Sequence, residues 1–433
     1  MTGTKLGKRF WLALTIFSLT GQVAWVVENM YFNVFVYKMF HATAGDISLM
    51  VGASAVAATL TTILIGALSD RVGKRKVFIS AGYILWGISI LSFTLIRTDV
   101  VAPLLPAAAN VASACVSLVI LMDCVMTFFG STANDACFNA WLTDSTDSTN
   151  RGAVEGINAM MPMIAILVVF GSFMFFNLDA AGSWVTIFAI IGGIVLAIGI
   201  LGFFVIEDRP VQKAPQGSYW SSIFYGFRPS VVRGNRVLYL TLAAFAVFGI
   251  SIQIFMPYLI LYYEQTLGMK NYVLIMAPAI VLAALFTALY GKLYDRWHFK
   301  KSIAPSILLL MAGYAVLYLT RGTLPVFLGS FFMMAGYLSG AAVFGAMMRN
   351  YTPPEQVGLF QGLRIVAQVL IPGIIGPAIG AAVLRNANTI VNGDGTTSFI
   401  PNANIWLAAF VAAILLWGML ALLFGRMRRE KCV

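Results

Sequence analysis

The chain has 433 residues, of which 60% are hydrophobic and only 10% are charged. Soluble globular domains carry about 25% charged residues, so this composition excludes an ordinary soluble protein and indicates one surrounded largely by lipid. The formal net charge is +11. The basic residues are scattered over many short segments, which argues against a nucleic-acid-binding face.

Twelve long apolar runs predict an all-α membrane protein, because a helix needs roughly 20 apolar residues to cross a bilayer. A β-barrel would show alternating segments of about ten residues instead. The first run follows Lys5, Lys8 and Arg9 but is too long for a signal peptide, so we expect it to remain as a helix. The runs cover residues 10–37, 47–69, 77–96, 112–143, 153–177, 183–206, 237–263, 271–293, 302–320, 324–348, 357–384 and 403–425.

The basic residues also predict the orientation of these helices. If both termini are cytoplasmic, 22 of the 28 lysines and arginines fall in inner segments and only five in outer segments. Lysine and arginine are retained on the cytoplasmic side of a membrane. We therefore expect a multi-pass protein of the cytoplasmic membrane with both ends inside.

The longest polar connection lies between the sixth and seventh runs. It predicts an N-terminal six-helix bundle at 1–206, a cytoplasmic linker at 207–236 and a C-terminal six-helix bundle at 237–433. Aromatic residues of the linker, followed by basic ones, favour either a short helix on the inner leaflet or an ordered linker packed on the helix ends. The aromatic and aliphatic members are Tyr219, Trp220, Ile223, Phe224 and Phe227.

A short loop occurs once in each half. The stretch "GALSDRVGKRK" at 66–76 shares glycine, leucine, aspartate and arginine with "GKLYDRWHFKK" at 291–301, at a constant offset. A second echo pairs "NRGAVEGI" at 150–157 with "QVGLFQGL" at 356–363. Six helices plus six, with a repeated loop in each half, is the layout of a secondary transporter.

The first loop resembles the G-x-x-x-D-R-x-G-R-K-R signature of the major facilitator superfamily. This resemblance implies two bundles that rock around a central cavity, with Asp70, Arg71, Asp295 and Arg296 gating the inner side. A carboxylate such as Asp70 is stabilised at the positive N-terminal end of a helix. The resemblance names the eleventh helix as the partner of Asp70 and the fifth as that of Asp295.

The other charges of the loop have two interpretations. Arg71, Lys74, Arg75 and Lys76 either determine topology alone or join an inner ion-pair lattice. The repeated Asp-Arg pair favours the lattice. Its expected acidic members are Asp144, Asp147 and Glu355.

Ionisable residues inside the apolar runs indicate where substrate and coupling ion bind, because such groups are costly in a membrane. They are Glu28, Asp123, Asp135 and Arg364. In the first run Gln22, Trp25 and Asn29 share a helix face, with Glu28 at its edge.

The fourth run carries a polar arc that contains Asp123, Thr127 and Asn134, while Asp135 lies about 120° from Asp123. A buried carboxyl group suits proton uptake and release because burial disfavours its charge. It also suits sodium ligation, sugar binding, or a purely structural hydrogen bond. Asp135 is expected at the same membrane depth as Arg364. We expect the two to form an ion pair, which either breaks as a gate when the cavity opens inward or is a permanent structural contact.

The solute is predicted from the polar and aromatic groups of both halves. In the second half these are Gln253, Tyr258, Tyr337 and Gln368. Amides, acids and aromatic faces suit a small, neutral, hydroxylated solute such as a sugar or glycoside. The expected partners are this solute and the lipid bilayer, and the fold is expected to work as a monomer.

The segment "WLTDSTDSTNRGAVEGI" at 141–157 resembles the corresponding loop of glycoside-pentoside-hexuronide:cation symporters and sucrose-type solute carriers. The melibiose-type members hold sodium with a pair of acids in the second helix, and 47–69 contains no acid. The chain departs from the family at this point, and the departure favours coupling to protons, through Asp123 or Glu28, over coupling to sodium. A basic residue of that family's eleventh helix is replaced here by Gln368, with Arg364 nearby.

Two other function classes are compatible with part of the sequence or excluded by it. A proton-coupled drug or metabolite antiporter of the same fold would use the same acids. An enzyme is not expected, because His41 and His298 lie in loops and no nucleophile-base grouping occurs. The four cysteines have no metal-site spacing, no ATP-binding loop is present, and no cofactor or metal is expected.

Overall fold

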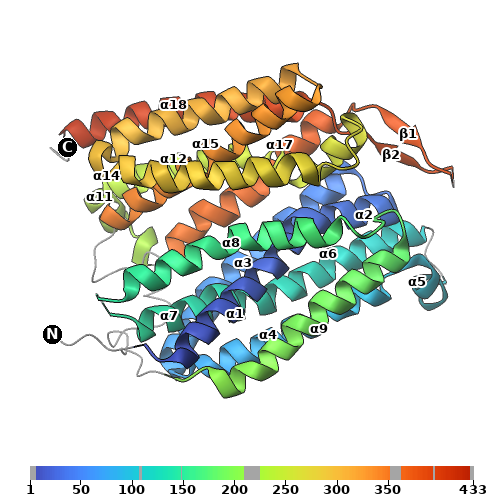
Figure 1. Ribbon diagram of the computed structural model, residues 1–433, viewed down its shortest axis with the longest axis horizontal. Coiled ribbons are helices and arrows are strands. Elements are labelled where there is room, and N and C mark those ends of the chain that lie inside the picture. The colour runs from blue at the N-terminus through green and yellow to red at the C-terminus, as the bar shows by residue number, and fades with distance from the viewer. Residues whose placement is uncertain are drawn as a thin grey trace. The chain divides into compact units, whose positions relative to one another are not determined.

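The computed structural model describes residues 6–106, 110–147, 149–208, 225–351, 362–393 and 395–429. Within these residues, twelve helices are long and apolar enough to cross a membrane, and each predicted run overlaps one of them (Figure 1). The all-α membrane architecture is therefore confirmed.

The chain divides into two compact units. Unit 1 consists of Met1–Ala42 and Ala53–Ile223, and unit 2 of Thr43–Gly52 and Phe224–Val433. Most of the linker predicted at 207–236, with the leaflet helix beginning at Tyr219, lies outside the described residues. Its described end forms the short helices η4 (Tyr225–Phe227) and α11 (Pro229–Gly234).

Unit 1 contains the first six membrane helices, two of which are interrupted by π-helical segments. In chain order its elements are α1 (Lys8–Val26), η1 (Val27–Tyr31), α2 (Phe32–Phe40), α3 (Ala44–Val72), α4 (Arg75–Ser92), η2 (Phe93–Leu95), α5 (Thr98–Leu104), α6 (Val111–Gly130), η3 (Ser131–Phe138), α7 (Asn139–Ser145), α8 (Arg151–Phe173) and α9 (Ala181–Val205). The first ten residues from Thr43, at the start of α3, group with unit 2.

Glycines bring α4 and α9 into backbone contact. A Cβ atom placed on Gly87 would lie 2.5 Å from the Leu196 nitrogen, and one on Gly199 would lie 2.5 Å from the Ile84 nitrogen. Small residues permit such approach between membrane helices, where dispersion contacts replace the hydrophobic effect as the driving force. Of this pair, α4 also packs against η3 and α9 against α1.

Unit 2 contains the remaining membrane helices and one β-hairpin. After α11 its elements are α12 (Arg236–Gln253), η5 (Met256–Tyr258), α13 (Leu259–Leu261), η6 (Tyr262–Thr266), α14 (Val273–Leu319), α15 (Thr323–Tyr351), η8 (Val366–Leu370), α17 (Ile371–Leu384), β1 (Thr389–Val391), β2 (Thr397–Phe399) and α18 (Asn404–Arg429). The continuous α14 holds two membrane spans, because the chain reverses at His298, whose φ is 55°.

The hairpin between α17 and α18 was not predicted. Its two strands pair antiparallel, with Ile390 opposite Ser398. Gly395 closes the turn at a φ of 82°, a left-handed conformation that glycine adopts without steric cost. The Asn392 amide donates to the Thr396 carbonyl across the turn at 2.8 Å.

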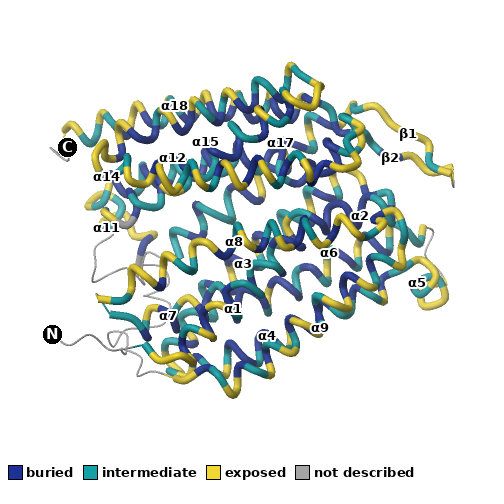
Figure 2. The backbone as a smooth tube through the Cα atoms, in the orientation of Figure 1, coloured by how far each residue is buried: buried dark blue, intermediate teal, exposed yellow. Residues whose placement is uncertain are grey.

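Large apolar side chains are exposed along the outer faces of the helices, as expected for lipid contact. Leu285, Leu289 and Leu415 are 58%, 67% and 65% exposed. Figure 2 shows exposed positions recurring along α9 and α18, each beside buried positions that face other helices. The exposed apolar side chains are therefore placed for contact with lipid, as the composition indicates.

Candidate functional site

Two irregular stretches of helix carry acidic residues of unit 1. The π-helical segment η1 contains Glu28, and η3 contains Asn134 and Asp135. A π-helical turn adds a residue to the helical repeat and occurs frequently at functional sites. Here the extra residue changes which side chains face the neighbouring helices.

Glu28 lies at the centre of a buried cluster of oxygen atoms. The hydroxyl groups of Ser54, on α3, and Thr127, on α6, lie 2.8 Å and 2.9 Å from Glu28 Oε1. The two hydroxyl oxygens are themselves 2.8 Å apart. Three helices therefore bring three oxygen atoms into mutual hydrogen-bonding distance.

Asp123 completes this cluster from α6, one helical turn before Thr127. It is 2% exposed, and it interacts with both the Ser54 hydroxyl and the Glu28 carboxyl. Among the described residues, Glu28 Oε2 and Asp123 Oδ1 are buried oxygens that accept no hydrogen bond. We call Glu28, Ser54, Asp123 and Thr127 the carboxyl cluster.

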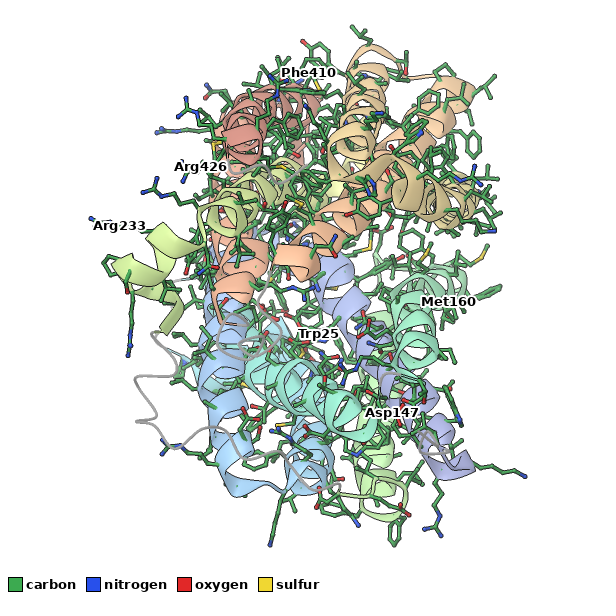
Figure 3. The ribbon with its side chains drawn as sticks, turned by 90° about the vertical axis from the view of Figure 1, so that its left-hand side faces the viewer. Trp25, Asp147, Met160, Arg233, Phe410 and Arg426 are labelled. Carbon is green, nitrogen blue, oxygen red and sulfur yellow. The ribbon has the colours of Figure 1, made fainter. Side chains whose placement is uncertain are left out.

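A layer of aromatic residues lies beside the carboxyl cluster. The Trp25 and Trp86 rings are 5.0 Å apart between centroids, and Gly130 leaves room for both. Their indole nitrogens are buried and donate no hydrogen bond to a described residue. Trp25 is labelled in Figure 3.

Asn134 occupies space left by a glycine on α1. A Cβ atom on Gly21 would lie 2.2 Å from Asn134 Nδ2 and 2.7 Å from the Tyr83 hydroxyl oxygen. Tyr83 donates to the Phe17 carbonyl at 2.7 Å, whereas Asn134 Nδ2 is buried without a described acceptor. Asn134 is thus a buried donor that packs against α1 at Gly21, one helical turn before Trp25.

The other polar residues predicted in unit 1 are less buried. Gln22 is half-buried, and Asn29 is exposed and donates through Nδ2 to the Trp25 carbonyl at 2.8 Å. Asp135 is half-buried and accepts from the Ser131 hydroxyl at 3.0 Å. These three residues lie outside the carboxyl cluster.

In unit 2, Gln253 and Tyr258 pack against α17. A Cβ atom on Gly376 would lie 2.4 Å from Gln253 Cβ, and one on Gly380 would lie 2.6 Å from the Tyr258 ring. The Tyr258 hydroxyl donates to the Ala44 carbonyl at 2.9 Å, and its ring is fully buried. Its position therefore has a packing explanation in the structure.

Gln368 and Tyr337 are the other residues of unit 2 that the sequence singles out. Gln368 lies in η8 and accepts through Oε1 from Arg364 Nε at 3.1 Å. Tyr337 is half-buried, and its ring stacks at 6.4 Å on Phe248. The expected pairing of Arg364 with Asp135 joins the two units and stays a prediction.

The repeated loop forms an ion-pair network within unit 1. Arg75 is buried and forms an ion pair with Asp70. It also donates a hydrogen bond through Nε to Asp144 Oδ2 at 3.0 Å. Arg75 Nη1 also donates to the Ser69 hydroxyl at 2.5 Å. The expected lattice is therefore present for Asp70, Arg75 and Asp144.

The remaining gating residues are placed only in part. Arg71 and Arg296 are exposed, and the side chain of Asp295 and all of Glu355 lie outside the described residues. The helix ends that Asp70 and Asp295 are expected to face stay predictions.

The sequence did not point to Ser54, Trp86 or Tyr83. A serine carries little signal in a membrane helix, because its hydroxyl can bond to a carbonyl of its own helix. The run that contains Ser54, 47–69, also has no acidic residue to mark it as part of a site. The glycines at 21 and 130 were the available signal, since each marks a place where a large side chain from another helix approaches.

A family model described as Major Facilitator Superfamily matches residues 10–343 of the chain. The chain belongs to the major facilitator superfamily. Members of the major facilitator superfamily are transporters of small-molecule solutes, and this chain is a multi-pass membrane transporter of that fold.

Several solved structures share the fold of this chain at low sequence identity. A mutant of the nucleoside transporter NupG is 13% identical, with a TM-score of 0.71, over 95% of this chain and 98% of that one. A bacterial homologue of the human lysosomal transporter Spinster is 15% identical, with a TM-score of 0.69, over 98% of both chains. The xylose transporter XylE from E. coli is 14% identical, with a TM-score of 0.68, over 94% and 97%. No curated protein sequence matches the chain.

Proposed function

We propose that this member of the superfamily is a symporter that couples the movement of a proton to that of a small hydroxylated solute, such as a sugar or glycoside. The carboxyl cluster is the coupling site. Protonation and deprotonation of Glu28, with Asp123 as its neighbour, drive the exchange between states open to the two sides of the membrane.

The observation that carries this proposal is the number of hydrogens in the cluster. Ser54, Thr127 and Glu28 Oε1 make three mutual contacts of 2.8–2.9 Å. The two hydroxyl groups supply only two hydrogens, and a contact at this distance without a hydrogen between the oxygens is repulsive. A proton on Glu28 supplies the third hydrogen and neutralises a charge that burial penalises.

The solute class rests on the polar groups beside the cluster. Trp25 and Trp86 offer buried indole donors and Asn134 a buried amide donor. Such donors suit hydroxyl or carbonyl oxygens, and aromatic faces suit the C–H face of a sugar ring. Structures with this fold include a D-xylose-proton symporter and a nucleoside transporter, whose solutes both carry a hydroxylated sugar ring.

The proposal also covers the orientation of the protein in the membrane, its gating residues and its oligomeric state. Both termini lie in the cytoplasm, since 22 of 28 basic residues then fall on the inner side. The gating role of Asp70 and Arg71, and of Asp295 and Arg296, belongs to the same proposal. The protein acts as a monomer, with Arg364 and Asp135 as an inner gate.

The test is uptake of labelled mono- and disaccharides into proteoliposomes under an imposed proton gradient and, separately, a sodium gradient. We expect one sugar to accumulate under the proton gradient alone. Glu28→Gln and Asp123→Asn should abolish accumulation. Glu28→Gln mimics the neutral carboxyl and should keep sugar exchange across equilibrated membranes.

Asp99→Asn is the matched control, because Asp99 is an exposed carboxylate that pairs with Arg97 outside the membrane spans. It should accumulate sugar as the wild type does. Accumulation under the sodium gradient alone would contradict proton coupling and would mean that a sodium ion binds at the oxygens of the carboxyl cluster instead. Solute leaving the vesicles as protons enter would contradict symport and support the antiporter alternative.

A further inference from the structure

One end of unit 2 carries a concentration of exposed positive charge. It comes from the turn between the two spans of α14 and from the last turn of α18. We call this group the basic surface. Its exposed members are Lys292, Arg296, Lys300, Lys301, Arg428 and Arg429.

Side-chain packing holds the two parts of the basic surface together. Lys300 Nζ lies 5.9 Å above the centre of the Phe424 ring, and the Phe299 and Phe424 rings are 6.3 Å apart. The Tyr290 hydroxyl donates to the Ser302 carbonyl at 2.6 Å across the turn. Arg233 on α11 and Arg426 on α18 lie on the same side of unit 2 in Figure 3.

The acidic side chains that the structure describes in unit 2 lie at the opposite end. Glu264 is in η6, at the far end of the span that begins at Arg236. Asp46 is two residues from Ala44, which accepts a hydrogen bond from Tyr258 near that same far end. No ion pair is found for the six members within the described residues.

The turn also presents an aromatic side chain suited to a membrane interface. Trp297 is 41% exposed and directly precedes His298, whose left-handed backbone reverses the chain. Tryptophan is enriched where hydrocarbon meets the lipid headgroups. Lysine and arginine at that depth attract anionic phospholipids.

We propose that the basic surface binds the headgroup phosphate of an anionic phospholipid, with Trp297 at the boundary between headgroup and acyl chain. Topology alone requires positive charge on one side of the membrane. It does not require two helices to bring that charge together beside a turn that also exposes a tryptophan. A phospholipid fits both features, because its phosphate and acyl chains occupy adjacent layers.

The test measures lipid retention by the full-length protein with native mass spectrometry, after exchange into mixed phosphatidylcholine and phosphatidylglycerol. We expect phosphatidylglycerol to be retained preferentially. The variants are K300Q/K301Q and R428Q/R429Q. Each removed charge should lower this preference roughly fivefold.

The matched control is K270Q/R385Q, which removes two exposed positive charges of unit 2 away from the basic surface. Trp297→Leu tests the interfacial contact and should weaken retention while the charge is unchanged. Equal loss in the control, or no preference in the wild type, would overturn the proposal. Competition by millimolar inorganic phosphate would also overturn it, since the site would then recognise free phosphate rather than lipid.

Discussion

Ser54 and Thr127 aim their hydroxyl groups at one oxygen of Glu28, so a change at either alters the site without removing a charge. Thr127→Val keeps the shape of the side chain and deletes one donor to Glu28 Oε1. A hydrogen bond to a charged group contributes about 1.5–3 kcal/mol, so the loss of this donor destabilises the deprotonated state of Glu28 that the transport cycle must visit. We expect proton-driven accumulation to fall roughly tenfold or more, measured in proteoliposomes.

Thr127→Ser is the companion variant, because it restores the hydroxyl and loses only a methyl group. It should recover most of the accumulation. Equal activity of the valine and serine variants would mean that the hydroxyl does not act on Glu28.

Gly130 allows a second test at the scale of single residues. A Cβ atom there would lie 2.7 Å from Trp86 and 3.0 Å from Trp25. Overpacking of this kind costs about 1–3 kcal/mol, so Gly130→Ala should lower the thermal unfolding temperature measured in detergent. Gly193→Ala, at a position with no atom within 4 Å, should leave it nearly unchanged.

The sequence predicted three members of the carboxyl cluster, Glu28, Asp123 and Thr127, and missed the fourth, Ser54. Glu28 and Asp123 stood out because a carboxyl inside an apolar run is expensive. Ser54 did not, because a hydroxyl costs little there. Which carboxyls meet also depends on the π-helical segment η1, which contains Glu28 and shifts side-chain directions away from the 100° spacing assumed for a regular helix.

At the scale of helices, the ends of α3, α4 and α7 are joined through Arg75. The Arg75 side chain is 4% exposed, and its partners Asp70 and Asp144 are 45% and 16% exposed. Arg75→Gln leaves two acidic groups without their cation. Breaking a buried pair costs about 3–5 kcal/mol, and the partial exposure of Asp70 places the expected loss at the lower end of that range.

Thermal unfolding in detergent checks this loss. Arg97→Gln breaks the exposed pair with Asp99 and serves as the control, with no measurable change expected. Similar destabilisation by both variants would show that Arg75 is not the cation that holds these helix ends.

The helices were predictable from hydropathy because length and apolar content alone define a membrane span. The β-hairpin was not. Its strands are three residues long, which is too short for an alternating pattern to be recognised. The loop at 291–301 was predicted from the gap between two runs, but the residue at which the chain reverses was not, because hydropathy does not report which residue takes the positive φ of 55° found at His298.

At the scale of the whole molecule, the distribution of lysine and arginine predicts the orientation in the membrane. With both termini inside, 22 of 28 basic residues lie on the cytoplasmic side. A fluorescent protein fused after Val433 should therefore fluoresce, and alkaline phosphatase fused within the hairpin should be active. The opposite pattern would reverse the topology and make the basic surface face outward.

The hairpin also has a practical consequence for imaging. A 47.0 kDa membrane protein offers little mass outside the bilayer for aligning single-particle images. The exposed turn between Val391 and Thr397 joins two paired strands, and loop tips of this kind tolerate insertions. An epitope inserted there would be presented on a short, hydrogen-bonded stalk, giving an antibody fragment a defined direction from which to mark the particle.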